Sequence, residues 1–261
     1  RANGGIKNQN YTLHSDIDLT DVDWTSLDIE NSIFDGNGFK IINLNLKNTN
    51  GNNLAFFNKV TNSTIKNVTF ENVKLSTNAN EASVVAISVE GTTSTLADIT
   101  VNFANEITNT FTNFAGIVNS LAGKIENCKV QNLTINENAK IDEVAGVANT
   151  INAGARLENN EVTANLKADK AIAGVANTNS GSILNTNAKI TVDYYSNVNT
   201  NSALTVAGLV DTNNAESSVQ NAIVDVNFKI NKTTNEIWTV GAVYMNNGSI
   251  SGVTVKGEGI E

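Results

Sequence analysis

Apolar residues in this chain recur at every second position over short stretches. Val162, Ala164 and Leu166 alternate with polar residues in this way, and the same alternation runs through residues 224–230. This spacing is the period of a β-strand with one buried face, whereas an amphipathic helix spaces its apolar residues three and four apart. The pattern predicts an all-β protein built from many short strands.

One short segment returns along the chain and sets the period of these strands. Its clearest copy covers residues 145–150 and reads Ala-Gly-Val-Ala-Asn-Thr. Similar segments cover residues 85–89, 115–120, 173–178, 207–212 and 240–245. Their spacing of about 28–34 residues lies in the range of solenoids and other repeat arrays. We therefore expect each copy to belong to one turn of a solenoid.

A second segment accompanies most copies, and in it Asn follows an apolar residue two positions later. The apolar residues are Ile65, Ile125, Leu157, Ile183 and Val219. Asn suits a corner because it tolerates left-handed backbone, and identical amides stacked from turn to turn can form a hydrogen-bonded ladder. Each repeat thus predicts two short strands, a tight corner and a third segment of variable length. Stacked in parallel, such repeats predict a right-handed, single-stranded parallel β-helix of about eight coils.

The composition agrees with strands and gives no sign of a linker. Asn makes up roughly one residue in six, and Asn, Thr and Val all rank low as helix formers. Proline is absent, so the usual linker signature is missing. We expect one continuous domain, with an N-terminal cap and first coils at residues 1–60 and repeat coils at residues 61–261.

The net charge of −9 narrows the classes of partner. A nucleic-acid surface needs clustered Lys and Arg, but the only arginines are Arg1 and Arg156. No apolar run reaches the roughly 18–20 residues of a membrane-spanning helix. We therefore expect neither nucleic-acid binding nor membrane insertion. Cys128 is the only cysteine, so no internal disulfide is possible.

Together, the two repeat segments resemble the short GLUG-type repeat of bacterial surface and secreted proteins. Residues 11–19, Trp24 and the turn at residues 34–39 are similar to the segment that often precedes such repeats. This pairing resembles the non-catalytic regions of streptococcal-type IgA-cleaving zinc metalloproteases and of Gram-positive adhesins. The resemblance covers nearly the whole chain, although these copies begin with Ala where the usual form begins with Gly. It implies a β-helix that is secreted or on the bacterial cell surface, in an adhesin or virulence context.

The sequence lacks the familiar catalytic constellations. A zinc protease needs a His-Glu-x-x-His helix, but His14 is the only histidine. No Gly-x-Ser-x-Gly nucleophile segment is present. Cys128 lies within a repeat strand and has no His near it in sequence, which favours a packing role. We expect no catalytic site, no cofactor and no metal ligand set of a zinc enzyme in this chain.

The densest acidic group leaves an enzymatic alternative open. It consists of Asp16, Asp18, Asp21 and Asp23. Two carboxylates facing one cleft would suit a polysaccharide hydrolase, and their oxygens would also suit Ca²⁺. The four residues alternate with apolar ones, however, which favours a solvated strand face and turn. A lyase acting on acidic sugars would also need basic residues to hold the substrate's carboxylates, and the presence of only two arginines, one of them at the terminus, argues against it.

Aromatic residues near the variable segments are candidate contacts for a partner protein or a sugar. Tyr194 and Tyr195 lie in the largest of these segments. Trp238 precedes one repeat glycine just as Phe111 and Phe114 precede another, so these side chains are expected on one face. Aromatic rings stack on sugars and anchor protein interfaces. Ordinary packing is the competing role, and it is favoured for the two tyrosines.

The sequence therefore favours a non-catalytic extracellular module. We expect it to bind a host protein or glycan, or to position an adjacent domain of the same polypeptide such as a metalloprotease domain. A carbohydrate-active β-helix enzyme is one alternative. A structural fibre subunit that stacks through its end coils is the other.

Overall fold

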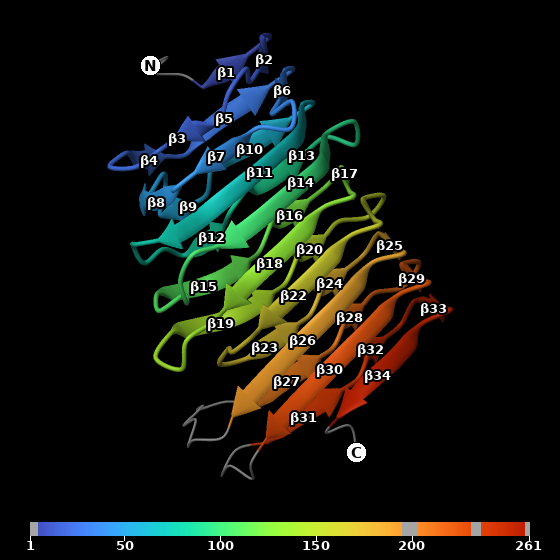
Figure 1. Cartoon of the computed structure of the whole chain (residues 1–261). Coiled ribbons are helices and arrows are strands. Elements are labelled where there is room, and N and C mark those ends of the chain that lie inside the picture. Colours follow the sequence, from blue (N-terminus) through green and yellow to red (C-terminus); the bar gives the residue numbers. More distant parts are fainter. Residues whose placement is uncertain (1–4, 195–202, 231–235, 259–261) are drawn as a thin grey trace.

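A computed structural model describes residues 5–194, 203–230 and 236–258 of the chain (Figure 1). All the regular structure in these ranges is β-strand. The strands stack in parallel from the blue N-terminal end to the red C-terminal end, as a β-solenoid of about seven turns. The predicted all-β parallel solenoid is confirmed, with a number of turns close to the expected eight. None of the described residues forms a helix long and apolar enough to cross a membrane.

Each turn contributes strands to three faces, two of which meet at the recurring Ala-Gly segment. The seven-stranded sheet contains β9 (Asn53–Leu54), β12 (Glu81–Ser83), β15 (Thr110–Ala115), β19 (Lys140–Ala145), β23 (Ala171–Ala173), β27 (Leu204–Ala207) and β31 (Ile237–Val240). The nine-stranded sheet contains β1 (Ile6–Lys7), β5 (Leu27–Glu30), β10 (Phe57–Thr61), β13 (Ala86–Glu90), β16 (Val118–Leu121), β20 (Ala148–Ile151), β24 (Ala176–Asn179), β28 (Val210–Asn213) and β32 (Val243–Asn246).

The third face holds the remaining strands, which pair from turn to turn in the same parallel manner. They are β2 (Asn10–Thr12), β3 (Ile17–Asp18), β4 (Asp23–Thr25), β6 (Ile33–Asp35), β7 (Lys40–Ile42), β8 (Asn45–Asn48), β11 (Thr64–Leu75), β14 (Thr95–Phe103), β17 (Lys124–Glu126), β18 (Lys129–Thr134), β21 (Arg156–Glu158), β22 (Glu161–Asn165), β25 (Ser182–Leu184), β26 (Asn187–Tyr194), β29 (Ser218–Gln220), β30 (Ile223–Ile230), β33 (Ser249–Ser251) and β34 (Thr254–Glu258).

Columns of apolar side chains fill the inside of the solenoid, with one side chain from each turn. In the seven-stranded sheet the fully buried column is Leu54, Ala82, Phe114, Val144, Ile172 and Val206. Each square ångström of apolar surface removed from water contributes about 25 cal/mol. Because the core is continuous from turn to turn, neighbouring turns stabilise one another without a disulfide.

The recurring Ala-Gly segment forms the sharp junction between the seven-stranded and nine-stranded sheets. β19 ends at Ala145 and β20 begins at Ala148, so Gly146 lies in the bend between them. A Cβ atom added at Gly146 would lie 2.0 Å from the carbonyl oxygen of Gly174 in the next turn. Glycine is required here because two backbones approach closely.

The Asn of the second repeat segment forms a different corner, on the third face. Asn67, Asn127, Asn159, Asn185 and Asn221 have left-handed φ values between 48° and 56°. The amide of Asn159 donates to Oδ1 of Asn127 at 3.4 Å, and the amide of Asn185 donates to Oδ1 of Asn159 at 3.1 Å. The corner and the amide ladder predicted for this Asn are both confirmed.

Candidate functional site

Side chains from two sheets meet on the outside of the solenoid where the sheets join. We call this region the outer junction and define it by Glu143, Asp211, Trp238, Tyr244 and a column of three asparagines, Asn119, Asn149 and Asn177. The asparagines are buried but do not belong to the apolar core. Trp238 of β31 and Tyr244 of β32 join the two sheets in the last turn, with ring centroids 5.7 Å apart. The outer junction therefore runs along several turns of the molecule.

The three asparagines form a second amide ladder, and this ladder has a direction. The amide of Asn119 donates to the carbonyl oxygen of Ala82 at 2.9 Å. The amide of Asn149 donates to Oδ1 of Asn119, and the amide of Asn177 donates to Oδ1 of Asn149 at 2.7 Å. Every NH₂ group thus points toward the N-terminal turns and every Oδ1 toward the C-terminal turns.

The ladder ends at Asp211 without a matching donor. β24 and β28 pair so that Asn177 and Asp211 lie side by side between the pairs Ala176–Val210 and Thr178–Thr212. Oδ1 of Asn177 and Oδ1 of Asp211 are both buried, and neither has a hydrogen-bond partner. Oδ2 of Asp211 accepts a hydrogen bond from the Thr212 hydroxyl at 3.2 Å. Two buried acceptors without donors therefore lie in adjacent strands at this end of the ladder, which is unusual because buried polar atoms are normally paired.

The charges around the ladder's end are mainly acidic. Burial raises the pKa of Glu143, and the nearby charge of Asp211 raises it further. Asp142 forms an ion pair with Lys170, whose Nζ lies 2.7 Å from Oδ2 of Asp142. Burial, followed by the charge of Asp142, raises the pKa of Asp169. The outer junction is thus a place where carboxylates are brought together and partly withdrawn from water.

The predicted aromatic contact residues divide into buried and exposed positions. Phe111 and Phe114 of β15 lie in the core, with ring centroids 5.9 Å apart, and so cannot contact a partner from there. Phe114 is in register with Val144, whereas Trp238 belongs to the outward column of Glu143 and is 49% exposed. The expectation that Trp238 shares one face with the two phenylalanines is therefore wrong. Phe114 is one position away from the outward column, and the alternation breaks between Phe111 and Phe114, which are both buried.

Tyr194 is also a core residue, as the packing alternative for the tyrosines predicted. It is 2% exposed, and its hydroxyl accepts from the backbone N–H of Ala168 and donates to the carbonyl oxygen of Ala168, both at 2.8 Å. Tyr195 lies outside the described residues. Trp238 is therefore the member of the predicted contact set that the described structure places on the surface.

Replacing Tyr194 with Phe is expected to lower the free energy of unfolding by about 1–2 kcal/mol, because it leaves two buried backbone groups of Ala168 without partners. Urea unfolding followed by circular dichroism measures the change. Tyr11→Phe, which alters an exposed hydroxyl, should leave stability within about 0.5 kcal/mol. An unchanged unfolding midpoint for Tyr194→Phe would contradict the structural role.

The acidic group near the N-terminus is held by local partners. Oδ1 of Asp18 accepts from Thr20 and Asn43, and these hydrogen bonds lower its pKa. Oδ1 of Asp16 accepts from the backbone N–H of Lys40 at 2.8 Å, and Asp23 forms an ion pair with Lys47. Among the described residues, no group of three or more His, Cys, Asp or Glu is placed to hold a metal ion. The arrangement corresponds to a solvated strand face.

The two other residues considered for catalysis are isolated from each other. His14 is exposed near the N-terminal end. Cys128 is fully buried, and burial raises the pKa of its thiol to about 12. A thiol with this pKa is almost wholly protonated at neutral pH and is therefore a poor nucleophile.

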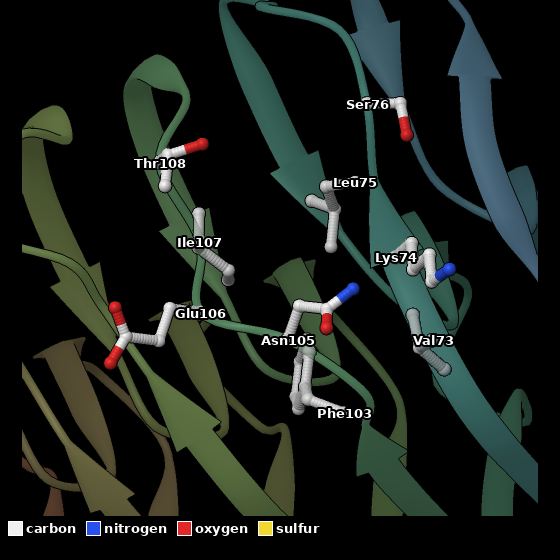
Figure 2. A pocket seen from close by; sticks show the side chains of 9 residues that line it. All are labelled: Val73, Lys74, Leu75, Ser76, Phe103, Asn105, Glu106, Ile107 and Thr108. Atoms are coloured by element: carbon white, nitrogen blue, oxygen red, sulfur yellow. The ribbon is translucent and has the colours of Figure 1, made fainter.

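A shallow cavity of about 240 Å³ lies on another edge of the solenoid, between the end of β11 and the segment after β14 (Figure 2). The backbone N–H of Ala104 bonds to Val73, but the N–H of Ile107 bonds to Thr134 in the following turn. The segment between Ala104 and Ile107 therefore leaves the end of β11 uncovered. Lys74 and Glu106 are the charged side chains that line the cavity.

No protein-family model matches this sequence, and no curated protein matches it. The fold is similar to the crystal structure of a putative immunoglobulin A1 protease from Bacteroides ovatus, with a TM-score of 0.68 and 17% sequence identity. The similarity covers 97% of this chain and 79% of that chain. At this identity the likeness establishes a shared β-solenoid fold.

Proposed function

We propose that this chain is a non-catalytic binding module of a bacterial protein that is secreted or held on the cell surface. The observation that carries the proposal is the fold shared with a protein described as a putative immunoglobulin A1 protease, over nearly the whole of this chain. The repeat resemblance to the non-catalytic regions of IgA-cleaving metalloproteases and adhesins points the same way. In such a protein, the rigid solenoid would also position a separate domain.

The burial and the hydrogen-bond partners of the residues considered for catalysis support a non-catalytic role. The single His is exposed near the N-terminal end, and the single Cys is buried with a raised thiol pKa. The N-terminal aspartates are engaged with local donors and lysines rather than aimed at a common point. An acid–base pair would need two groups on either side of a bound substrate.

Partner binding is assigned to the exposed end of the outer junction. Trp238 offers a large exposed ring beside Tyr244, and aromatic residues of this kind dominate protein and sugar contacts. The carboxylates and amides along the junction supply polar groups of the kind that orient a ligand. Rigid strands hold all of these side chains, so little conformational entropy is lost on binding.

A binding survey tests the proposal. The purified chain is applied to a panel of mammalian glycans and to immobilised immunoglobulin A, and binding is measured by biolayer interferometry. Trp238→Ala is expected to weaken binding at least tenfold, whereas Tyr11→Ala, an exposed aromatic at the other end of the molecule, should leave it unchanged. Equal binding by the wild-type protein and Trp238→Ala would overturn the assignment of the contact face.

The enzymatic alternative is tested with the same material. A panel of polysaccharides is incubated with the chain, and released reducing ends and unsaturated sugars are measured. The proposal predicts no release above background. Release that Glu143→Gln abolishes would replace the proposal with a carbohydrate-active enzyme, because Glu143 is the carboxyl group whose raised pKa suits a general acid.

A further inference from the structure

The direction of the buried amide ladder is fixed at its N-terminal end. Asn119 donates to the carbonyl oxygen of Ala82, and a backbone carbonyl oxygen can only accept. Rotating the Asn119 amide by 180° would place Oδ1 against that oxygen. Asn149 and Asn177 must then follow the same orientation, because each amide donates to the one before it. Rotating all three amides together would only move the mismatch from Asp211 to the Ala82 carbonyl oxygen.

That mismatch consists of two oxygens that need something positive between them. Asn177 is 95% buried, since its exposed fraction is 5%, and its Oδ1 lacks a donor. Oδ1 of Asp211, in the adjacent strand, lacks one too. The ladder holds its successive side chains within hydrogen-bond distance, so the same spacing brings these two oxygens close together. An unpaired buried acceptor costs about 1–3 kcal/mol, and here there are two.

The surrounding charge favours a cation over a neutral donor. Glu143 lies close enough to Asp211 for the two carboxylates to repel each other. Lys170 precedes Ala171, the register partner of Glu143, and its Nζ is already bonded to Asp142. A bridging water molecule would satisfy the two oxygens but would leave the negative charge uncompensated. A bound cation would satisfy the two oxygens and would also compensate the negative charge.

The donor set identifies the class of cation. Asp, Glu and Asn side-chain oxygens are hard ligands, which Ca²⁺ accepts at 2.3–2.6 Å with water completing its flexible coordination shell. Soft metals prefer thiolate and imidazole, and neither is present here. Ala171 separates Glu143 from Thr205 in the outward column, so the small side chain leaves room above Glu143.

We propose that Ca²⁺ binds at the C-terminal end of the buried amide ladder, bridging Oδ1 of Asn177 and Oδ1 of Asp211, with the carboxylate of Glu143 as the facing ligand. The site uses two carboxylates and one amide, so its affinity falls in the range of weak extracellular Ca²⁺ modules, with a Kd of about 10⁻⁴–10⁻³ M. The ion pins three consecutive turns to one another, and so links the stability of the solenoid to the Ca²⁺ concentration.

Thermal unfolding in EDTA and in CaCl₂ tests this proposal. At a Ca²⁺ concentration tenfold above the Kd, the Tm of the wild-type chain is expected to rise by about 3–5 °C. Tb³⁺ provides an independent readout, because Tyr244 and Trp238 in the next turn can sensitise its luminescence. Ca²⁺ should displace Tb³⁺. Unchanged Tm values together with no sensitised luminescence would overturn the site and leave a bridging water as the explanation.

Asp211→Asn separates a metal site from a merely structural carboxylate. The new amide can donate to Oδ1 of Asn177 and so continue the ladder. This variant is therefore expected to lose the Ca²⁺ response while its Tm in EDTA equals or exceeds that of the wild type. Asp225→Asn, which removes an exposed carboxylate from β30, should keep the full response. A Ca²⁺ response that survives in Asp211→Asn would overturn the proposal.

Glu143→Gln tests the third ligand. Its affinity for Tb³⁺ is expected to fall at least tenfold, since a neutral amide replaces one of two carboxylates. The fold is retained because Glu143 belongs to the outward column of β19, whereas the inward position beside it is Val144. An unchanged affinity would overturn the assignment of Glu143 as a ligand.

Discussion

Replacing Gly174 with Ala is expected to destabilise the solenoid by about 4 kcal/mol, enough to unfold much of the chain at moderate temperature. The added Cβ would lie 2.0 Å from the carbonyl oxygen of Gly208 and 2.8 Å from Cγ1 of Ile190. The carbonyl oxygen belongs to the backbone of the next turn, so it cannot rotate away. The two turns must separate, which breaks hydrogen bonds such as that from Val175 N–H to the Leu209 carbonyl at 2.8 Å.

Gly154→Ala is the matched control for this change. Gly154 has a left-handed φ of +81°, but a Cβ there would meet nothing within 4 Å. Its cost is therefore limited to backbone strain, about 1 kcal/mol. Denaturant unfolding followed by circular dichroism compares both variants with the wild type. A loss below about 1 kcal/mol for Gly174→Ala would mean that the turns are not packed as closely as the structure has them.

The same glycines explain why the fold could be predicted from the sequence. The Ala-Gly segment must recur once in every turn, because each turn approaches the next at the same point. A requirement that repeats at a fixed interval is visible in a single sequence without any comparison. The Asn of the second segment is visible for the same reason, since each turn needs a left-handed corner such as Asn159. Architecture was therefore the more predictable part of this protein.

Whether an individual aromatic side chain points into the core or into solvent was less predictable, because the inward–outward alternation of side chains breaks inside each turn. In β10, Phe57 and Val60 are buried while the two residues between them, Asn58 and Lys59, both point outward. One such irregularity reverses the inward or outward assignment of every later position in the strand. Phe114 and Trp238 precede their glycines by slightly different distances, and this difference is enough to place one in the core and the other in solvent.

The outer junction itself could not be recognised from sequence alone. Asn149 and Asn159 are the same residue type in the same repeat, yet one forms a buried ladder within a strand and the other an exposed corner. Asp211 takes the place of Asn at the equivalent position of its repeat, which was visible in the sequence as a departure from the pattern. Its meaning depends on the direction of the ladder, and that direction is set by the Ala82 carbonyl, which no sequence pattern records.

Asn149→Asp is expected to lower the free energy of unfolding by about 3 kcal/mol at pH 7. The two side chains have nearly the same shape, so the change tests hydrogen bonding rather than packing. The introduced carboxylate can still accept from the amide of Asn177, but it faces Oδ1 of Asn119 with no hydrogen to donate. A carboxylate oxygen and Oδ1 of Asn119 then face each other in the interior without a donor between them.

The stability lost in Asn149→Asp should decrease as the pH falls. Burial and the missing donor raise the folded-state pKa of the introduced carboxyl above its unfolded value of about 3.9. The destabilisation is therefore full above the folded-state pKa and shrinks as the pH falls through it, because the protonated carboxyl can donate to Asn119. Asn159→Asp, at an exposed corner that Asp tolerates, should stay within about 0.5 kcal/mol of the wild type and show no such recovery. If Asn149→Asp were as stable as the wild type at pH 7, the amides could reverse freely, and the fixed direction that leaves Asp211 without a donor would not exist.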